Sequence, residues 1–130
     1  MIYGIGTDIC DLRRVQAVFE RRGERFVKAI LGEREMMIWR ARAARSEMRG
    51  TAFLATRFSA KEAFSKALGT GMHAPMRWRD CEILNNPDGR PIIVLNGALR
   101  DYCAERGLRA QISLSDERDS VVSFVILEHD

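Results

Sequence analysis

The sequence predicts an α+β domain in which one long helix packs on a mainly antiparallel sheet. Three observations support this: a glycine-containing strand at the start, an uninterrupted helical segment in the middle, and mostly strand-like segments towards the end. The chain has 130 residues and shows no repeat, low-complexity run or linker. We therefore expect one domain over residues 1–130.

Residues 2–9 alternate as a strand does. One face carries larger side chains, and the other carries Gly4, Gly6 and Asp8. Glycine inside a strand lets another element or a ligand approach the backbone closely, and Asp8 stands where it could meet that neighbour. The alternative is that Asp8 ends the strand and caps the next turn.

Several helices should follow this strand. Asp11 is a candidate N-cap and Gly23 a candidate stop for the first, a second short stretch ends at Gly32, and a third covers residues 33–45. Gly50 marks the expected break before the longest helix. That helix should cover residues 51–68, about 27 Å at the standard rise.

The last part of the chain should be mainly strands. The expected segments are strands 79–84 and 91–95 around a turn at 86–89, a short helix at 98–106, and strands 110–115 and 120–128. An apolar run lies inside the last strand, at Phe124, Val125, Ile126 and Leu127. Such a run is apolar on both strand faces, which fits either a buried central strand or a strand that contacts another copy of the chain.

The charge of the chain is uneven. The net charge is +3, with 11 basic and 7 acidic residues in 1–50 against 10 and 11 in 51–130. The first part would attract an acidic partner, although for the charge alone a solvated helix face is the simpler explanation. Three scattered cysteines without ligand spacing, and no segment of membrane-spanning length, favour a reduced, cytoplasmic protein without a membrane partner.

Glu62 stands out on the long helix. Leu54, Phe58, Glu62 and Lys66 follow one another at intervals of four, so Glu62 continues an apolar row. A carboxylate on an inward face needs an ionic partner or a cation. The simplest explanation is a Glu62–Lys66 pair along the helix, which contributes about 0.3–0.5 kcal/mol.

The neighbours of Glu62 favour a magnesium–phosphate site. Arg57, Lys61 and Lys66 are cationic, and a Gly-Thr-Gly loop follows at 69–71, where the backbone could approach phosphate oxygens. Magnesium prefers oxygen ligands and is usually held by one or two carboxylates together with substrate phosphates. Asp8 and Glu62 could supply those carboxylates. Lysine, unlike arginine, can also give a proton to a leaving group.

Two motifs resemble the holo-acyl-carrier-protein synthases, which are small phosphopantetheinyl transferases. The first is Gly4-Ile5-Gly6-Thr7-Asp8-Ile9 followed by Arg14, and the second is Arg57-Phe58-Ser59-Ala60-Lys61-Glu62-Ala63-Phe64-Ser65-Lys66-Ala67 with Gly69-Thr70-Gly71. The resemblance covers nearly the whole chain. It implies the family fold and transfer of 4′-phosphopantetheine from coenzyme A to a serine of apo acyl carrier protein. That reaction releases adenosine 3′,5′-bisphosphate and supports fatty acid biosynthesis.

The resemblance also implies roles for particular residues. Asp8 and Glu62 would hold Mg²⁺, and Lys66 would stabilise or protonate the leaving phosphate. A metal-bound water or a nearby carboxylate would take the serine proton, with Glu62 the carboxylate in reach. The expected contacts with coenzyme A are Arg57, Lys61, Ser65, Lys66, Gly69, Thr70 and Gly71.

Further implications concern partners. Arg14, Arg21 and Arg25 would dock the acidic carrier protein, and the protein would be a homotrimer with its site between protomers. One position departs from the family pattern: many members have histidine after Ser-x-Ser, whereas this chain has Asp116. An acidic side chain beside a phosphate repels it, so we expect that contact with coenzyme A to lie elsewhere in this chain.

Two other functions fit parts of the pattern. A magnesium-dependent nucleotide pyrophosphatase would use the same carboxylates with water as acceptor, and it would consume coenzyme A without a carrier protein. A small basic nucleic-acid-binding module would use the arginine-rich early helices. Those helices lack interleaved aromatic residues, and this function leaves Asp8 and Glu62 unexplained, so we expect no nucleic-acid partner.

Overall fold

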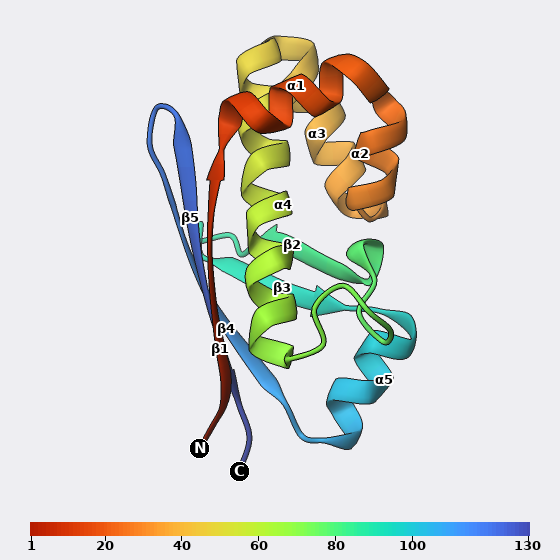
Figure 1. Ribbon diagram of the computed structural model, residues 1–130, viewed down its shortest axis with the longest axis vertical. Helices are drawn as coiled ribbons and strands as arrows, with labels where there is room; N and C mark the ends of the chain where they lie inside the picture. The colour runs from red at the N-terminus through yellow and green to blue at the C-terminus, as the bar shows by residue number, and fades with distance from the viewer.

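A long central helix lies against one face of an antiparallel sheet, as expected for an α+β protein, in a computed structural model that describes residues 1–130 (Figure 1). In chain order the elements are β1 (Ile2–Asp11), α1 (Leu12–Arg22), α2 (Glu24–Ile30), α3 (Glu33–Arg45), α4 (Glu47–Leu68), the 3-10 turn η1 (Trp78–Asp80), β2 (Cys81–Asn85), β3 (Pro91–Leu95), α5 (Gly97–Glu105), β4 (Arg109–Asp116) and β5 (Ser120–Glu128). The main sheet has the order β1-β5-β4, and β2 and β3 form a separate hairpin. All neighbouring strands are antiparallel, which confirms the predicted fold class.

The glycine face of β1 is where α4 packs. A Cβ atom added at Gly4 would collide with the backbone carbonyl of Ala67, and one at Gly6 with the carbonyl of Ala63. The helix therefore lies directly on the strand backbone, which only glycine permits. This confirms the prediction that the face allows close approach, and the neighbour is α4.

The start of α4 differs from the prediction. The helix begins at Glu47 after Ser46, whose side chain accepts a hydrogen bond from the Arg49 backbone N–H. Gly50 lies inside the helix, so the expected break there is wrong. A Cβ at Gly50 would stand 2.9 Å from the Cβ of Ala43, which shows that this glycine serves the close packing of α3 on α4. With 22 residues, α4 is about 33 Å long.

The other boundaries agree with the sequence to within about two residues, the usual spread at element ends. Asp11 caps α1 by accepting a hydrogen bond from the Arg13 N–H, and the N–H of Gly23 closes the helix on the Phe19 carbonyl. The later strands and the 86–89 turn also lie where they were predicted. The strand β5, which contains the apolar run, is the central strand of the main sheet. Val125 and Leu127 are buried on the face towards α4, and Phe124 and Ile126 are half-buried on the other face.

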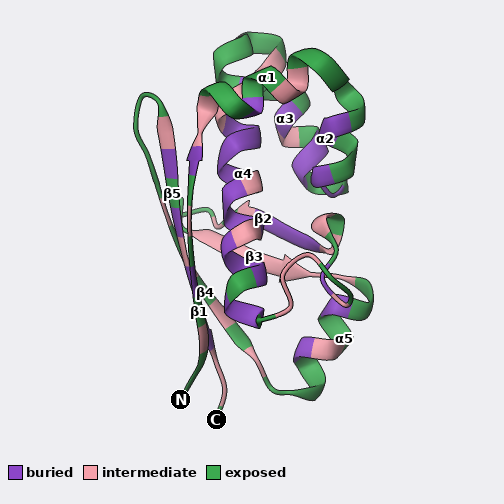
Figure 2. Ribbon diagram, in the orientation of Figure 1, coloured by how far each residue is buried: buried purple, intermediate pink, exposed green.

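The core surrounds α4 (Figure 2). One apolar cluster joins the first half of α4 to the helices α1–α3, and a second joins its second half to the hairpin, α5, β4 and β5. The three cysteines are buried and unbonded to one another. None of the helices combines the length and the apolar character that crossing a membrane requires.

Candidate active site

Asp8 lies on β1 at the point where the glycine face meets α4. It is paired across the sheet with Ser123 of β5, and its backbone carbonyl accepts a 3.4 Å hydrogen bond from the Ser59 hydroxyl. Ser123 in turn donates to Ser59 at 2.7 Å. Two serines thus join the strand to the helix beside the Asp8 carboxylate. Asp11, not Asp8, caps the following helix, which rules out the capping alternative.

Lys66 reaches towards β1 from the last turn of α4. Its Nζ donates to the Thr7 carbonyl at 2.9 Å and lies 3.4 Å from Oδ1 of Asp8. The Lys66 side chain is 53% exposed and that of Asp8 15% exposed. The ammonium therefore pairs with Asp8 and not with Glu62, so the simple helix pair expected as the alternative is absent. Its exposure leaves the ammonium open to a substrate.

Glu62 is half-buried, and its electrostatic surroundings are unfavourable. Burial raises the pKa of its carboxyl, the negative charge of Asp8 raises it further, and only Lys66 lowers it. The two carboxylates, which the sequence placed together, are thus close enough to influence each other. A cation bound between them would relieve this repulsion.

The donor set suits a hard divalent cation. Asp8 and Glu62 offer oxygen ligands, and nowhere in the chain do three or more His, Cys, Asp or Glu side chains gather as metal ligands. A complete protein cage is therefore absent. Magnesium does not need one, since it usually keeps waters and takes substrate phosphates as further ligands. These two residues are the ones that could hold it.

Arg57 does not line this site. It is 5% exposed, its Nε donates to the Ile83 carbonyl at 3.0 Å, and its Nη2 donates to Oδ1 of Asn85 at 2.8 Å. Its guanidinium also lies 4.2 Å from the centre of the Phe53 ring. Burial lowers the pKa of this group to about 10. The expected coenzyme A contact is wrong, because the side chain joins α4 to β2.

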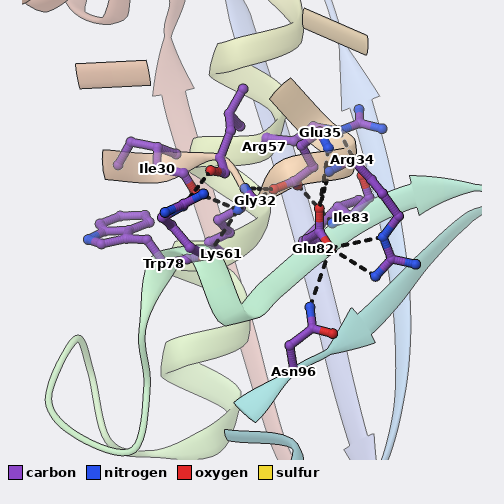
Figure 3. A network of polar contacts seen from close by, with 12 residues as sticks. Ile30, Gly32, Arg34, Glu35, Arg57, Lys61, Trp78, Glu82, Ile83 and Asn96 are labelled. Carbon is purple, nitrogen blue, oxygen red and sulfur yellow. Dashed lines mark hydrogen bonds and ion pairs between the residues drawn. The ribbon is translucent and has the colours of Figure 1, made fainter. Parts of the chain in front are cut away.

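Lys61 and Ser65 are also interior residues. Lys61 is fully buried, and its ammonium contacts the side chain of Glu35 and two backbone carbonyls (Figure 3). Ser65 is 1% exposed, and its hydroxyl donates to the Glu62 carbonyl. Neither can reach a ligand, so these two predicted contacts are wrong as well. Successive helix residues point about 100° apart, so Glu62 and Lys61 face different surroundings.

The Gly-Thr-Gly loop is accessible. Gly69 ends α4 with a φ of +88°, a left-handed conformation that favours glycine, and its N–H donates to the Ser65 carbonyl at 3.0 Å. Gly71 also has a positive φ. The loop begins three residues after Lys66. It is placed beside the site as expected, and its contact with coenzyme A stays a prediction.

A pocket that the sequence analysis missed lies between α1, α2 and α4. Its volume is about 310 Å³, and its lining is mostly apolar: Cys10, Arg14, Val15, Ala17, Val18, Arg21, Phe26 and Phe58. Two of the predicted docking arginines are thus in its wall. The third, Arg25, lines an adjoining hollow with Arg21 and Arg22. Apolar residues of α1 interleaved with arginines were the signal that could have revealed it.

Asp116 lies in a further hollow that the sequence did not indicate. Its other charged lining residues are Arg42, Arg45 and Arg49, from α3 and the start of α4, and its volume is about 710 Å³. The acidic side chain is therefore outnumbered by cations. An anion that enters this hollow would meet attraction as well as the repulsion inferred from Asp116 alone.

Comparisons with known proteins agree with the fold. The family model of the 4′-phosphopantetheinyl transferase superfamily matches residues 4–125. A holo-[acyl-carrier-protein] synthase of Leptothrix cholodnii is 59% identical over 98% of this chain and 97% of its own length. The crystal structure of such a synthase from Neisseria meningitidis superposes with a TM-score of 0.91 at 37% identity, covering 98% of this chain and 99% of that one.

A holo-(acyl-carrier-protein) synthase from Bacillus anthracis, solved in complex with coenzyme A (3′,5′-ADP), has a TM-score of 0.84 at 32% identity. The match covers 100% of this chain and 99% of that one. Family model, sequence relatives and solved structures therefore agree over the length of the chain. The chain belongs to the 4′-phosphopantetheinyl transferase superfamily.

Proposed function

We propose that this protein transfers the 4′-phosphopantetheine group of coenzyme A to a serine of an apo acyl carrier protein, at a site formed by Asp8, Glu62 and Lys66. The observation that carries the proposal is the convergence of two carboxylates and an open ammonium where α4 meets the glycine face of β1. Its full-length relatives are named for the same transfer. The product, a holo carrier protein, would serve fatty acid biosynthesis.

Asp8 and Glu62 are the residues we expect to hold Mg²⁺. Their oxygens suit this cation, and burial together with the negative charge of Asp8 raises the pKa of Glu62, so a bound cation would be favoured here. When bound, the cation would neutralise phosphate oxygens during the transfer.

Lys66 and Glu62 divide the proton chemistry in this proposal. The serine oxygen forms a bond to the phosphorus that carries pantetheine, and the bond from that phosphorus to the bridging pyrophosphate oxygen breaks. Lys66 stabilises or protonates the departing adenosine 3′,5′-bisphosphate, since its ammonium is exposed and held by Thr7 and Asp8. A group at the site must also accept the serine proton, and Glu62 is the carboxylate in reach.

The carrier protein would dock on α1 and α2. Arg14 and Arg21 border the 310 Å³ apolar pocket, and Arg25 lies in the adjoining hollow. An acidic helix with one apolar side chain would match this surface in both charge and shape. Phe58 lines this pocket and lies on α4, the helix that also carries Glu62. A partner bound in the pocket would therefore be near the reaction site.

We also propose self-association as a homotrimer. The face of the main sheet opposite α4 carries no other element (Figure 1) and exposes apolar residues, among them Ile5 at 58% and Ile9 at 71%. Ile5 pairs across the sheet with Ile126, and Ile9 with Val122. A contiguous apolar face of this kind is typical of an interface, and further copies of the chain are the occupant we infer. Buried, unpaired cysteines accord with a cytoplasmic location.

The test is the intact mass of an apo acyl carrier protein after incubation with this protein, coenzyme A and Mg²⁺. We expect a gain of one phosphopantetheine, which Asp8→Ala and Glu62→Ala abolish and which Glu105→Ala, an exposed acid on α5, preserves. Absence of the gain with several carrier proteins, from a folded enzyme that binds coenzyme A, would reject the proposal. Consumption of coenzyme A without a carrier protein would favour the pyrophosphatase.

A further inference from the structure

Lys61 and Glu35 form a fully buried ion pair with an N–O distance of 2.6 Å (Figure 3). The Lys61 ammonium also donates to the Ile30 carbonyl at 2.6 Å and the Trp78 carbonyl at 2.9 Å. Its three protons are therefore all used. The Glu35 carboxylate accepts from two backbone N–H groups, those of Gly32 at 3.0 Å and Ile83 at 2.8 Å. We call these two side chains the buried pair.

The buried pair joins elements that are far apart in the sequence. Its contacts reach the end of α2, the start of α3, the middle of α4, the turn η1 and the strand β2. A buried ion pair is weak grounds for stability, because well-packed apolar side chains of similar volume often serve as well. What apolar side chains cannot reproduce is this set of directed bonds to four backbone groups.

Two routes lead from the buried pair to the docking surface. The first passes through Ile30, the last residue of α2, which also carries Arg25 and Phe26. The second passes through Trp78, whose ring stacks on Phe58 with centroids 5.1 Å apart and planes inclined by 20°. Phe58 in turn lies 6.2 Å from Phe26. Phe26 and Phe58 are both walls of the apolar pocket.

The proposed reaction site lies next to the buried pair on helix α4. Glu62 follows Lys61 on α4, so the segment that carries the proposed base and metal ligand is also the one tied to α2 and η1. We infer that Lys61 and Glu35 are positioning residues, which fix the α1–α2 docking surface at a set place relative to Glu62. This inference rests on the proposed function, because it assigns the carrier protein to that surface.

Positioning and simple stabilisation predict different measurements. A purely stabilising pair would affect every property of the folded enzyme to a similar degree. A positioning pair acts on the use of the carrier protein, because the serine must arrive at the Asp8–Glu62 site from the docking surface. Coenzyme A binding should be spared, since neither Lys61 nor Glu35 is exposed to it.

The test replaces both partners by apolar residues of similar length, Glu35→Leu with Lys61→Met, in the full chain. The KM for apo acyl carrier protein should rise about tenfold or more, while the affinity for coenzyme A with Mg²⁺, measured by calorimetry, stays within about twofold. Amide hydrogen exchange should become at least about tenfold faster in residues 24–31 and stay unchanged in β1 and β5. The matched control is Glu105→Leu, an exposed position on α5.

A wild-type KM or wild-type exchange in residues 24–31 would overturn the inference, as would an equal loss of coenzyme A affinity. If the double variant does not fold, Trp78→Leu provides the test. This variant keeps the backbone carbonyl that accepts a hydrogen bond from Lys61, and it removes the ring that stacks on Phe58. A wild-type KM in that variant would also overturn it. Hydrogen exchange needs no turnover, so failure of the unaltered enzyme to transfer anything would reject the proposed function separately.

Discussion

Helix α4 carries two lysine–acid pairs that differ in almost every physical respect. The Lys61–Glu35 pair has an N–O distance of 2.6 Å, and neither side chain is exposed. The Lys66–Asp8 pair has a distance of 3.4 Å, and the lysine is half exposed. The first has no free donor left, whereas the second can still meet a substrate. Two lysines of one motif thus serve different purposes.

The position of each lysine on the helix explains this difference. Five residues separate Lys61 from Lys66, a rotation of about 140° around the helix axis. Lys61 points between α2 and η1, where backbone carbonyls surround it. Lys66 lies in the last turn, beside β1 and before the open Gly-Thr-Gly loop. The surroundings of each face therefore determine which lysine is structural and which is available for chemistry.

The largest expected effect follows from breaking the buried pair on one side only. Lys61→Met leaves the Glu35 carboxylate buried without a counter-charge, which costs about 3–5 kcal/mol of the free energy of unfolding. Lys66→Met, the matched change at the exposed pair, should cost less than about 1 kcal/mol. Urea unfolding of both variants measures the difference. Equal losses would contradict the contrast drawn between the two pairs.

A smaller loss of stability is expected when the contact between α4 and the glycine face of β1 is disturbed. This contact holds Lys66 beside Asp8. In Gly6→Ala the added Cβ meets the Ala63 carbonyl, so α4 must move away from β1, at about 1–3 kcal/mol. Asp8 and Lys66 then separate, and transfer activity should fall much more than stability does. Thermal unfolding and the carrier-protein assay together check this. Full activity in a folded Gly6→Ala enzyme would show that the close contact is not needed for the site.

Sequence patterns were sufficient for most of the fold and for bringing Asp8, Glu62 and Lys66 to attention as one candidate site. Caps such as Asp11 and Gly69 act locally, so their signals survive without the tertiary structure. Asp8 and Glu62 were proposed because a carboxylate on a glycine face or in an apolar row requires an explanation, and their role stays a prediction. Gly50 was misread as a break, because the neighbour that makes it necessary, Ala43 of α3, could not be inferred from sequence spacing.

The contacts proposed for coenzyme A were less predictable for the same reason. The motif presents Arg57, Lys61 and Ser65 in one row of letters with Glu62, and cations near carboxylates favour a phosphate site. Which of them point outwards depends on where α2, β2 and η1 lie. Only the folded chain shows that these three side chains are buried.

Glu62 belongs to neither lysine–acid pair, and its charge can be tested through the pH dependence of stability. Burial and Asp8 raise its pKa above the ordinary value of 4.5, so the folded state binds the proton more tightly than the unfolded state. Ionisation of Glu62 therefore lowers the free energy of unfolding as the pH rises from the unfolded-state pKa to the folded-state pKa. Above the folded-state pKa this loss of stability is complete. Glu62→Gln should raise stability at pH 7 by less than about 1 kcal/mol, since the group is partly solvated, while it abolishes transfer.

The comparison is thermal unfolding of Glu62→Gln and the unaltered enzyme at pH 7 and below about pH 4. The gain should vanish at the lower pH, where glutamate is protonated in both states. Glu20→Gln, an exposed glutamate on α1, serves as the control and should change little at either pH. A gain that persists in acid would mean that the electrostatic explanation for Glu62 is wrong.

The smallest effect on stability, and a selective effect on function, is expected at the docking arginines. Arg14 and Arg21 are exposed and have no acidic partner within ion-pair distance, so changing both to alanine should leave the unfolding midpoint almost unaltered.

Charges at the rim of an interface mainly accelerate the encounter of the two proteins, and salt screens them over about 10 Å at 0.1 M. The rate of carrier-protein association should therefore fall in the double variant at low salt and converge with the unaltered enzyme as salt rises. Stopped-flow measurements over a salt series test this, with Arg100→Ala and Arg109→Ala as a control of equal charge. If both double variants lost the same rate, net charge alone would attract the partner. A loss confined to Arg14 and Arg21 would place the encounter on the surface beside Phe26 and Phe58, where an exposed charge can act on function without stabilising the fold.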